Sequence, residues 1–184
     1  MKNIISILAL ILTTITMAQS EEKLPYHEIG PYSKTYTQGT VAARMVDGLG
    51  FRYYWATEGL RPEDLNYKPS ESGRTSAETI EHLYGLSNFI LSSISSDEKQ
   101  NKALEMTFDE KRKLTLLNFK KASDILKATD DVSQFDNDRY PFWNVINGPI
   151  ADALWHCGQI VMLRRASGNP FNSKVSVFQG KLKE

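Results

Sequence analysis

The stretch that decides the fold is P-I-A-D-A-L-W-H-C-G-Q-I-V-M-L-R-R-A-S-G, residues Pro149 to Gly168. Its apolar residues recur at helical spacing, which predicts a buried helix of about five turns. Asn147 and Gly148 suit cap positions, Pro149 suits the first helical position, and Gly168 stands where a helix ends. The predicted apolar face consists of Ile150, Ala153, Leu154, Cys157, Ile160, Val161 and Leu163.

Two polar residues, Asp152 and His156, lie on the edge of that apolar face. Side chains four residues apart stack on one side of a helix, with Cβ atoms roughly 5–6 Å apart. One carboxylate oxygen and one imidazole nitrogen could therefore reach the same metal ion, at bond lengths of about 2.0–2.2 Å. Taken alone, the spacing is more typical of a surface Asp that pairs with a His. A third ligand from elsewhere would favour a metal site.

The composition is that of an ordinary globular protein. The chain has 184 residues, of which 41% are hydrophobic and 24% charged, and this predicts one domain with one core. The 22 Lys and Arg residues balance the 22 Asp and Glu residues, so we expect no nucleic-acid partner. The single cysteine, Cys157, cannot form an internal disulfide, and its place on the apolar face predicts a small core residue.

The first residues have the pattern of a signal peptide over residues 1–18. Lys2 precedes the apolar run Ile4 to Ile15, and small residues follow up to Ala18. The run is too short to span a bilayer comfortably. Because there is no cysteine at the junction, a lipid anchor is not indicated. We expect cleavage after Ala18, to within a residue or two, and an exported protein, periplasmic or secreted, with no membrane attachment afterwards.

Residues 19–39 resemble an extended lead-in with little structure of its own, whose His27 we expect on the surface, away from any site. Residues 40–184 contain three further helical patterns. The first covers Thr40 to Gly59, the second follows a capping box at residues 75–78, and the third follows another box at 107–110 and ends near Thr129. The second pattern has the apolar face Ile80, Leu83, Ser87, Ile90, Leu91 and Ile94, and the third has Leu114, Leu117, Ala122, Ile125 and Leu126.

The elements predict an all-α protein, a four-helix bundle with long crossover connections over Leu60 to Arg74 and Asp130 to Ile146. No segment has a persuasive strand pattern. The basic residues of the third helix should form a solvated face. The tail, residues 169–184, either packs through Val175, Val177 and Phe178 or frays. Ligand sites in such bundles are built from facing helices, and this gives His82, on the second helix, a potential role.

Three motifs in this order resemble the DinB-like superfamily of four-helix metalloproteins, which includes thiol-dependent S-transferases and isomerases. In chain order they are G-L-R-P-E-D-L-N-Y-K-P (Gly59–Pro69), E-H-L (Glu81–Leu83) and H-C-G-Q-I-V-M-L-R-R-A-S-G (His156–Gly168). The resemblance covers Val41 to Gly168. It implies one divalent metal ion, commonly zinc or nickel, bound by a histidine early in the second helix and by H-x-x-x-H on the fourth.

Carried over to this chain, the family pattern implies the metal ligands His82, Asp152 and His156, with Asp152 standing where the family has a histidine. Two histidines and one carboxylate also suit iron or manganese. The anionic ligand should make a bound water less acidic and the ion a weaker Lewis acid. The alternative is a degenerate site, with Asp152 as a polar remnant in a non-catalytic periplasmic binding or scaffold bundle.

With the metal site intact, the resemblance implies a metal-dependent hydrolase or transferase acting on a small molecule that the sequence does not identify. Export argues against thiol transfer, because the thiol cofactors of such enzymes are cytosolic. Family members often form homodimers. Gln159 is either an amide that orients a ligand or a satisfied polar residue. Trp143 and Trp155 could wall an apolar pocket near the metal, but core packing is the favoured prediction for both. The general acid or base stays unassigned among Glu78, Glu81 and Asp47.

Overall fold

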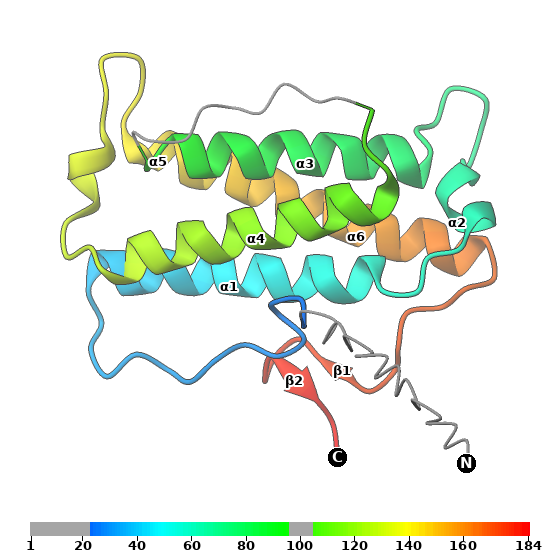
Figure 1. Ribbon diagram of the computed structural model, residues 1–184, viewed down its shortest axis with the longest axis horizontal. Coiled ribbons are helices and arrows are strands. Elements are labelled where there is room, and N and C mark those ends of the chain that lie inside the picture. Colours follow the sequence, from blue (N-terminus) through cyan, green and yellow to red (C-terminus); the bar gives the residue numbers. More distant parts are fainter. Residues whose placement is uncertain (1–22, 96–104) are drawn as a thin grey trace, which may run out of the picture.

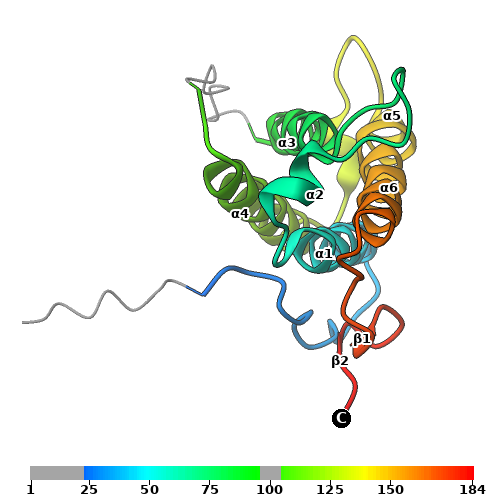
Figure 2. The same ribbon diagram turned by 90° about the vertical axis from the view of Figure 1, so that its right-hand side faces the viewer.

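Four long helices dominate the computed structural model, which describes residues 23–95 and 105–184 (Figure 1). Helices α1 and α3 each pack against both α4 and α6 (Figure 2). The predicted all-α class is confirmed. The predicted signal peptide, residues 1–18, lies outside the described residues, and within those residues no helix is long and apolar enough to span a bilayer. The four helices are α1 (Gln38–Thr57), α3 (Ser76–Ser92), α4 (Phe108–Lys127) and α6 (Ala151–Ala166).

Short elements connect and extend these helices. Helix α2 (Pro62–Asn66) lies between α1 and α3, and η1 (Val132–Phe135), α5 (Phe142–Val145) and η2 (Ile146–Ile150) precede α6. The tail contains a two-stranded antiparallel pair, β1 (Val175–Ser176) and β2 (Lys181–Leu182), where the sequence predicted no strand.

Of the three tail residues predicted to pack, one does. Val175 is buried against Phe51 and Trp55, whereas Val177 and Phe178 are exposed. Because strands of two residues are too short for a period-2 pattern, the sequence carries no signal for them.

Capping boxes define the starts of the helices, as predicted for α3 and α4. The backbone N–H of Glu78 donates to the Thr75 hydroxyl over 3.1 Å, and the Glu78 carboxylate accepts from the Thr75 backbone over 2.7 Å. The same reciprocal pair forms between Thr107 and Glu110. Helix α1 begins earlier than predicted, because Thr37 caps it.

Helices α1 and α6 run in one direction, and α3 and α4 in the other (Figure 1). Because α3 and α4 are parallel, the chain between Ser92 and Phe108 connects opposite ends of the assembly. The predicted crossover over Leu60 to Arg74 is wrong in this respect, since that segment joins neighbouring ends of the antiparallel helices α1 and α3 and includes α2.

The buried face of α4 differs from the predicted one. Leu116 and Phe119 are fully buried, whereas Leu117 is 37% exposed. Ala122 and Leu126 are buried as predicted, so the prediction fails in the first half of the helix, where a shift of one residue rotates the buried face by about 100°. Arg112, expected on the solvated face, is buried: it donates to the Thr57 hydroxyl over 2.9 Å.

The lead-in is packed more closely than its composition suggested. Tyr26 is buried over Gly50 of α1, where an added Cβ would lie 2.5 Å from the Tyr26 ring. The ring of His27 is half-buried, in contact with the rings of Tyr54 and Trp55. Residues 23–37 contain no helix or strand, as predicted for the lead-in. The expectation of an exposed His27 is wrong, because the lead-in packs on α1, where Gly50 leaves room for the Tyr26 ring.

Pro149 does not begin a helix. It lies inside the π-turn η2, which continues without a break from α5 into α6, so Asn147 and Gly148 are not caps. In an α-helix a proline ring clashes with the carbonyl four residues earlier, and the wider π-turn relieves that contact. The first turn of α6, which carries Asp152, follows directly after this irregularity.

Candidate metal centre

Three side chains from two neighbouring helices converge at one point. His82 comes from the second turn of α3, and Asp152 and His156 come from the first two turns of α6. The two oxygens of Asp152 divide between the histidines, with Oδ2 3.0 Å from His82 Nε2 and Oδ1 3.3 Å from His156 Nε2. One ligand atom from each residue lies within 4.8 Å of the others, and the group could hold a metal ion.

The geometry of the three residues fits a divalent ion. Two ligand atoms at about 2.1 Å from one ion lie at most about 4.2 Å apart, and about 3.4 Å apart at a tetrahedral angle. The Asp152 oxygens, 3.0 Å and 3.3 Å from their histidine nitrogens, match that spacing. The two imidazole rings meet edge to face with centroids 4.6 Å apart. Zinc, nickel, iron and manganese all accept this donor set.

The site is partly open to solvent. The side chains of His82 and Asp152 are each 37% exposed, and that of His156 is 13% exposed. Three protein ligands leave coordination positions for water or a substrate, which is the arrangement of catalytic rather than structural ions.

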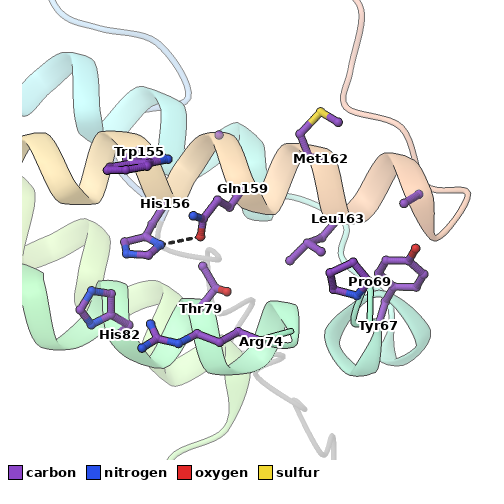
Figure 3. A pocket seen from close by; sticks show the side chains of 12 residues that line it. Tyr67, Pro69, Arg74, Thr79, His82, Trp155, His156, Gln159, Met162 and Leu163 are labelled. Carbon is purple, nitrogen blue, oxygen red and sulfur yellow. Dashed lines mark hydrogen bonds between the residues drawn. The ribbon is translucent and has the colours of Figure 1, made fainter. Parts of the chain in front are cut away.

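Gln159 makes the contact with His156 that the sequence allowed. Its Oε1 lies 2.7 Å from His156 Nδ1, one turn further along α6 (Figure 3). When this oxygen accepts the Nδ1 hydrogen, the Nε2 of a neutral imidazole presents a lone pair to Asp152 Oδ1. Two lone pairs facing one another at this distance repel unless a cation lies between them. Gln159 thus orients His156 as a ligand.

The three acidic residues considered as a general acid or base are committed elsewhere. Glu78 completes the cap of α3, Glu81 pairs with Lys111, and the buried Asp47 pairs with Lys127. None of the three lines a cavity at the triad. The carboxylate that the structure places in the site is Asp152.

A cavity of about 1040 Å³ adjoins the triad, between α6, the start of α3 and the link that follows α2 (Figure 3). His82 and His156 form part of its wall. A second cavity of about 670 Å³ lies on the Asp152 side and shares His82 and Trp155 with the first. The other residues lining the larger cavity are Tyr67, Pro69, Arg74, Thr79, Trp155, Gly158, Gln159, Met162, Leu163 and Ala166.

Both tryptophans predicted to pack in the core are exposed, Trp143 by 71% and Trp155 by 72%. On α6 the buried apolar positions are Ala153, Cys157 and Ile160, and Trp155 projects from the opposite side of the helix and lines the cavity. Cys157 is buried as predicted, and burial raises the pKa of its thiol to about 12.

Three cavity residues, Tyr67, Pro69 and Arg74, were not foreseen as site residues. They lie in the link between α2 and α3, where no helical or strand pattern fixes a direction for a side chain. The available signal was the loop motif Gly59–Pro69, which contains two of them but does not say that it faces the triad.

Comparison of the chain with protein-family models, with curated proteins and with solved structures returns no match. The DinB-like resemblance rests on the motifs and their order alone.

Proposed function

We propose that the protein is an exported metal-binding protein, a DinB-like four-helix bundle that acts as a metal-dependent hydrolase or transferase on a small molecule. The observation that carries this is the convergence of His82, Asp152 and His156 at the wall of a large cavity. The order of the motifs supports the family. When bound, the divalent ion would polarise a substrate or activate a water molecule.

The chain's own residues have separable tasks in this proposal. His82 and Asp152 join α3 to α6 at the site, so the relative position of the two helices fixes the ligand geometry. Gln159 fixes the ring orientation of His156. The adjoining cavity receives the small molecule and excludes part of the solvent around it.

One observation favours a second candidate, a non-catalytic binding or scaffold bundle. His82 Nε2 and Asp152 Oδ2 lie 3.0 Å apart, which is also the length of an ordinary hydrogen bond between a protonated nitrogen and a carboxylate. A triad joined only by hydrogen bonds, with no metal ion, would be a structural link between α3 and α6.

Elemental mass spectrometry on the mature protein, purified without chelator or affinity tag, distinguishes the two candidates. The metal proposal expects about one equivalent of a divalent metal per chain, lost in both His82→Ala and Asp152→Ala. His27→Ala is the matched control, because this histidine packs against Trp55 and should leave the metal content unchanged. No metal after reconstitution with zinc, nickel, manganese and iron would refute the proposal, and metal retained in Asp152→Ala would remove this carboxylate from the ligand set.

Two further measurements test the remaining parts. A screen of chromogenic esters, amides and phosphoesters against the metal-loaded protein, with His82→Ala as the inactive reference, tests catalysis. The mass of the protein secreted by the producing cell tests export: processing after Ala18 leaves Gln19 at the N-terminus.

A further inference from the structure

We propose that the large cavity takes a small carboxylate with a flat apolar body, its carboxylate bound by Arg74 and its body by Trp155 and Met162. This deepens the proposed function, because it names the class of molecule that would lie beside the triad. Binding in the cavity is nevertheless a property of Arg74 and the apolar wall, and it can be tested without reference to the metal.

The apolar wall of the cavity is unusually exposed. Met162 is 62% exposed and Trp155 72% exposed, on the same side of α6, and both line the cavity. Large apolar side chains gathered at a hollow of this kind mark a binding site more often than an accident of packing. Tyr67 and Pro69, from the link after α2, lie beside Leu163 and also line the cavity, so α6 and the link both supply apolar or aromatic groups suited to a flat molecule (Figure 3).

The charge in this cavity is of one sign. Arg74 is the lining residue with a permanent charge, and no Asp or Glu lines the cavity among the described residues. The two acidic residues that flank Arg74 in the sequence, Glu71 and Glu78, are not among the lining residues, and Glu78 directs its carboxylate to the backbone of Thr75 as the cap of α3. A cavity with one positive group and no negative one selects an anion over a neutral or cationic molecule.

The number of donors favours a carboxylate over a phosphate. A planar guanidinium matches the two oxygens of a carboxylate, and one such fork satisfies one negative charge. Among the neutral groups at this end, the Thr79 hydroxyl already donates to Thr75 O and the Gln159 oxygen contacts His156 Nδ1, which leaves the amide nitrogen of Gln159 as a neutral donor beside Arg74. A phosphate dianion would bring more charge and more acceptors than these groups can meet.

The positions of Arg74 and of the apolar wall also fix the direction in which the ligand lies. Figure 3 shows the guanidinium of Arg74 pointing toward His82, with Tyr67, Pro69 and Leu163 at the other end of the hollow. The carboxylate end of the ligand therefore lies near His82, and the apolar body lies along α6, over Trp155 beside the triad and Met162 two turns further on.

The test is calorimetric titration of the mature protein with 2-naphthoate and with its neutral isostere 2-naphthamide, before and after chelator treatment. We expect the acid to bind roughly tenfold or more tightly than the amide in both states, because a charged hydrogen-bonded pair is worth that much. Arg74→Gln should bring the ratio close to one and leave the amide's affinity unchanged. Arg139→Gln, an exposed arginine in the loop before α5, should keep the wild-type ratio. Trp155→Ala should weaken both compounds.

An unchanged ratio in Arg74→Gln, or no binding of 2-naphthoate, would overturn the carboxylate proposal. Unchanged affinities in Trp155→Ala would overturn the assignment of the apolar body. Both variants alter exposed side chains, and thermal unfolding followed by circular dichroism verifies that they fold. Since the ratio is measured with and without chelator, a protein that binds no metal can still support this proposal, and one that binds metal can still refute it.

Discussion

Gln159 Oε1 lies 2.7 Å from His156 Nδ1, on the side of the ring away from Asp152. A group that fixes the ring and its tautomer raises the affinity of a histidine for metal, typically by 10- to 100-fold. We therefore predict that Gln159→Leu lowers the affinity for zinc by roughly that factor, measured by competition with a chromogenic chelator. Gln179→Leu, at an exposed position in the tail, is the control. Equal affinities in the two variants would show that Gln159 does not support the site.

Asp64 is a buried carboxylate that anchors α2 to the end of α6. It accepts from the side chain and the backbone N–H of Arg61, and also from Ser167 and Asn169. The hydrogen bonds from the Arg61 side chain, followed by those from the other donors, hold the pKa of Asp64 far below its ordinary value. Asp64→Asn should lower the free energy of unfolding at pH 7 by about 2 kcal/mol, because the Arg61 guanidinium loses its negative partner and one acceptor oxygen is replaced by a donor.

The effect of Asp64→Asn should depend on pH in a defined direction. A carboxylate whose pKa is lowered by folding contributes its full stability above the unfolded value of about 3.9, and loses it as the pH falls below that value. The difference between wild type and variant in urea unfolding should accordingly be smaller at pH 3 than at pH 7. A difference that grows on acidification would contradict this account of Asp64.

Arg164 of α6 caps the C-terminal end of α1. Its guanidinium is buried and donates to the carbonyl oxygens of Trp55 and Ala56, over 3.1 Å and 3.0 Å, in the last turn of that helix. We predict that Arg164→Ala costs about 2–3 kcal/mol, because buried carbonyls are left without donors. The neighbouring exposed Arg165→Ala should stay within about 0.5 kcal/mol of wild type. Chemical denaturation of both variants checks the pair, and equal costs would mean that the buried contacts contribute nothing.

Two glycines of α1 should respond in opposite ways to alanine. A Cβ on Gly39 would lie 1.8 Å from the backbone oxygen of Thr129, so Gly39→Ala must push α4 away and should cost about 3 kcal/mol. A Cβ on Gly48 would meet only the flexible end of Arg52, at 3.3 Å, and Gly48→Ala should gain about 0.5–1 kcal/mol of helix stability. Thermal unfolding of the two variants should shift in opposite directions. A gain for Gly39→Ala would show that the close approach of α1 and α4 is not required.

The helices could be predicted because their starts and periods are local properties. The boxes at Thr75 and Thr107 act within four residues, so the sequence contains all that is needed to place them. What failed depends on neighbours that the sequence does not reveal. Leu116 rather than Leu117 faces the core because α4 contacts α1 and α3 at a particular rotation. Pro149, typical of a helix start, lies within a π-turn.

The triad could be assembled from the sequence because two of its members share one helix, and the spacing of Asp152 and His156 fixes their separation. The third, His82, came from the resemblance, and the structure brings it to the same point. The cavity beside it could not be foreseen. Trp155 lines the cavity because Cys157 and Ala153 occupy the buried side of α6, and the position of Arg74 depends on how the link after α2 folds back.

The contact between His82 and Asp152 joins residues that are 70 positions apart in the chain. An ion bound there would close a ring of the polypeptide that contains the whole of α4 and the connection joining opposite ends of the assembly. Keeping that ring closed would cost the unfolded chain entropy, by an amount that grows slowly with the length of the ring, so an ion that binds the folded chain would stabilise it much as a reversible cross-link does. The same two side chains would thus set both the chemistry of the cavity and the thermal endurance of the fold, and an environment poor in metal would lower both together.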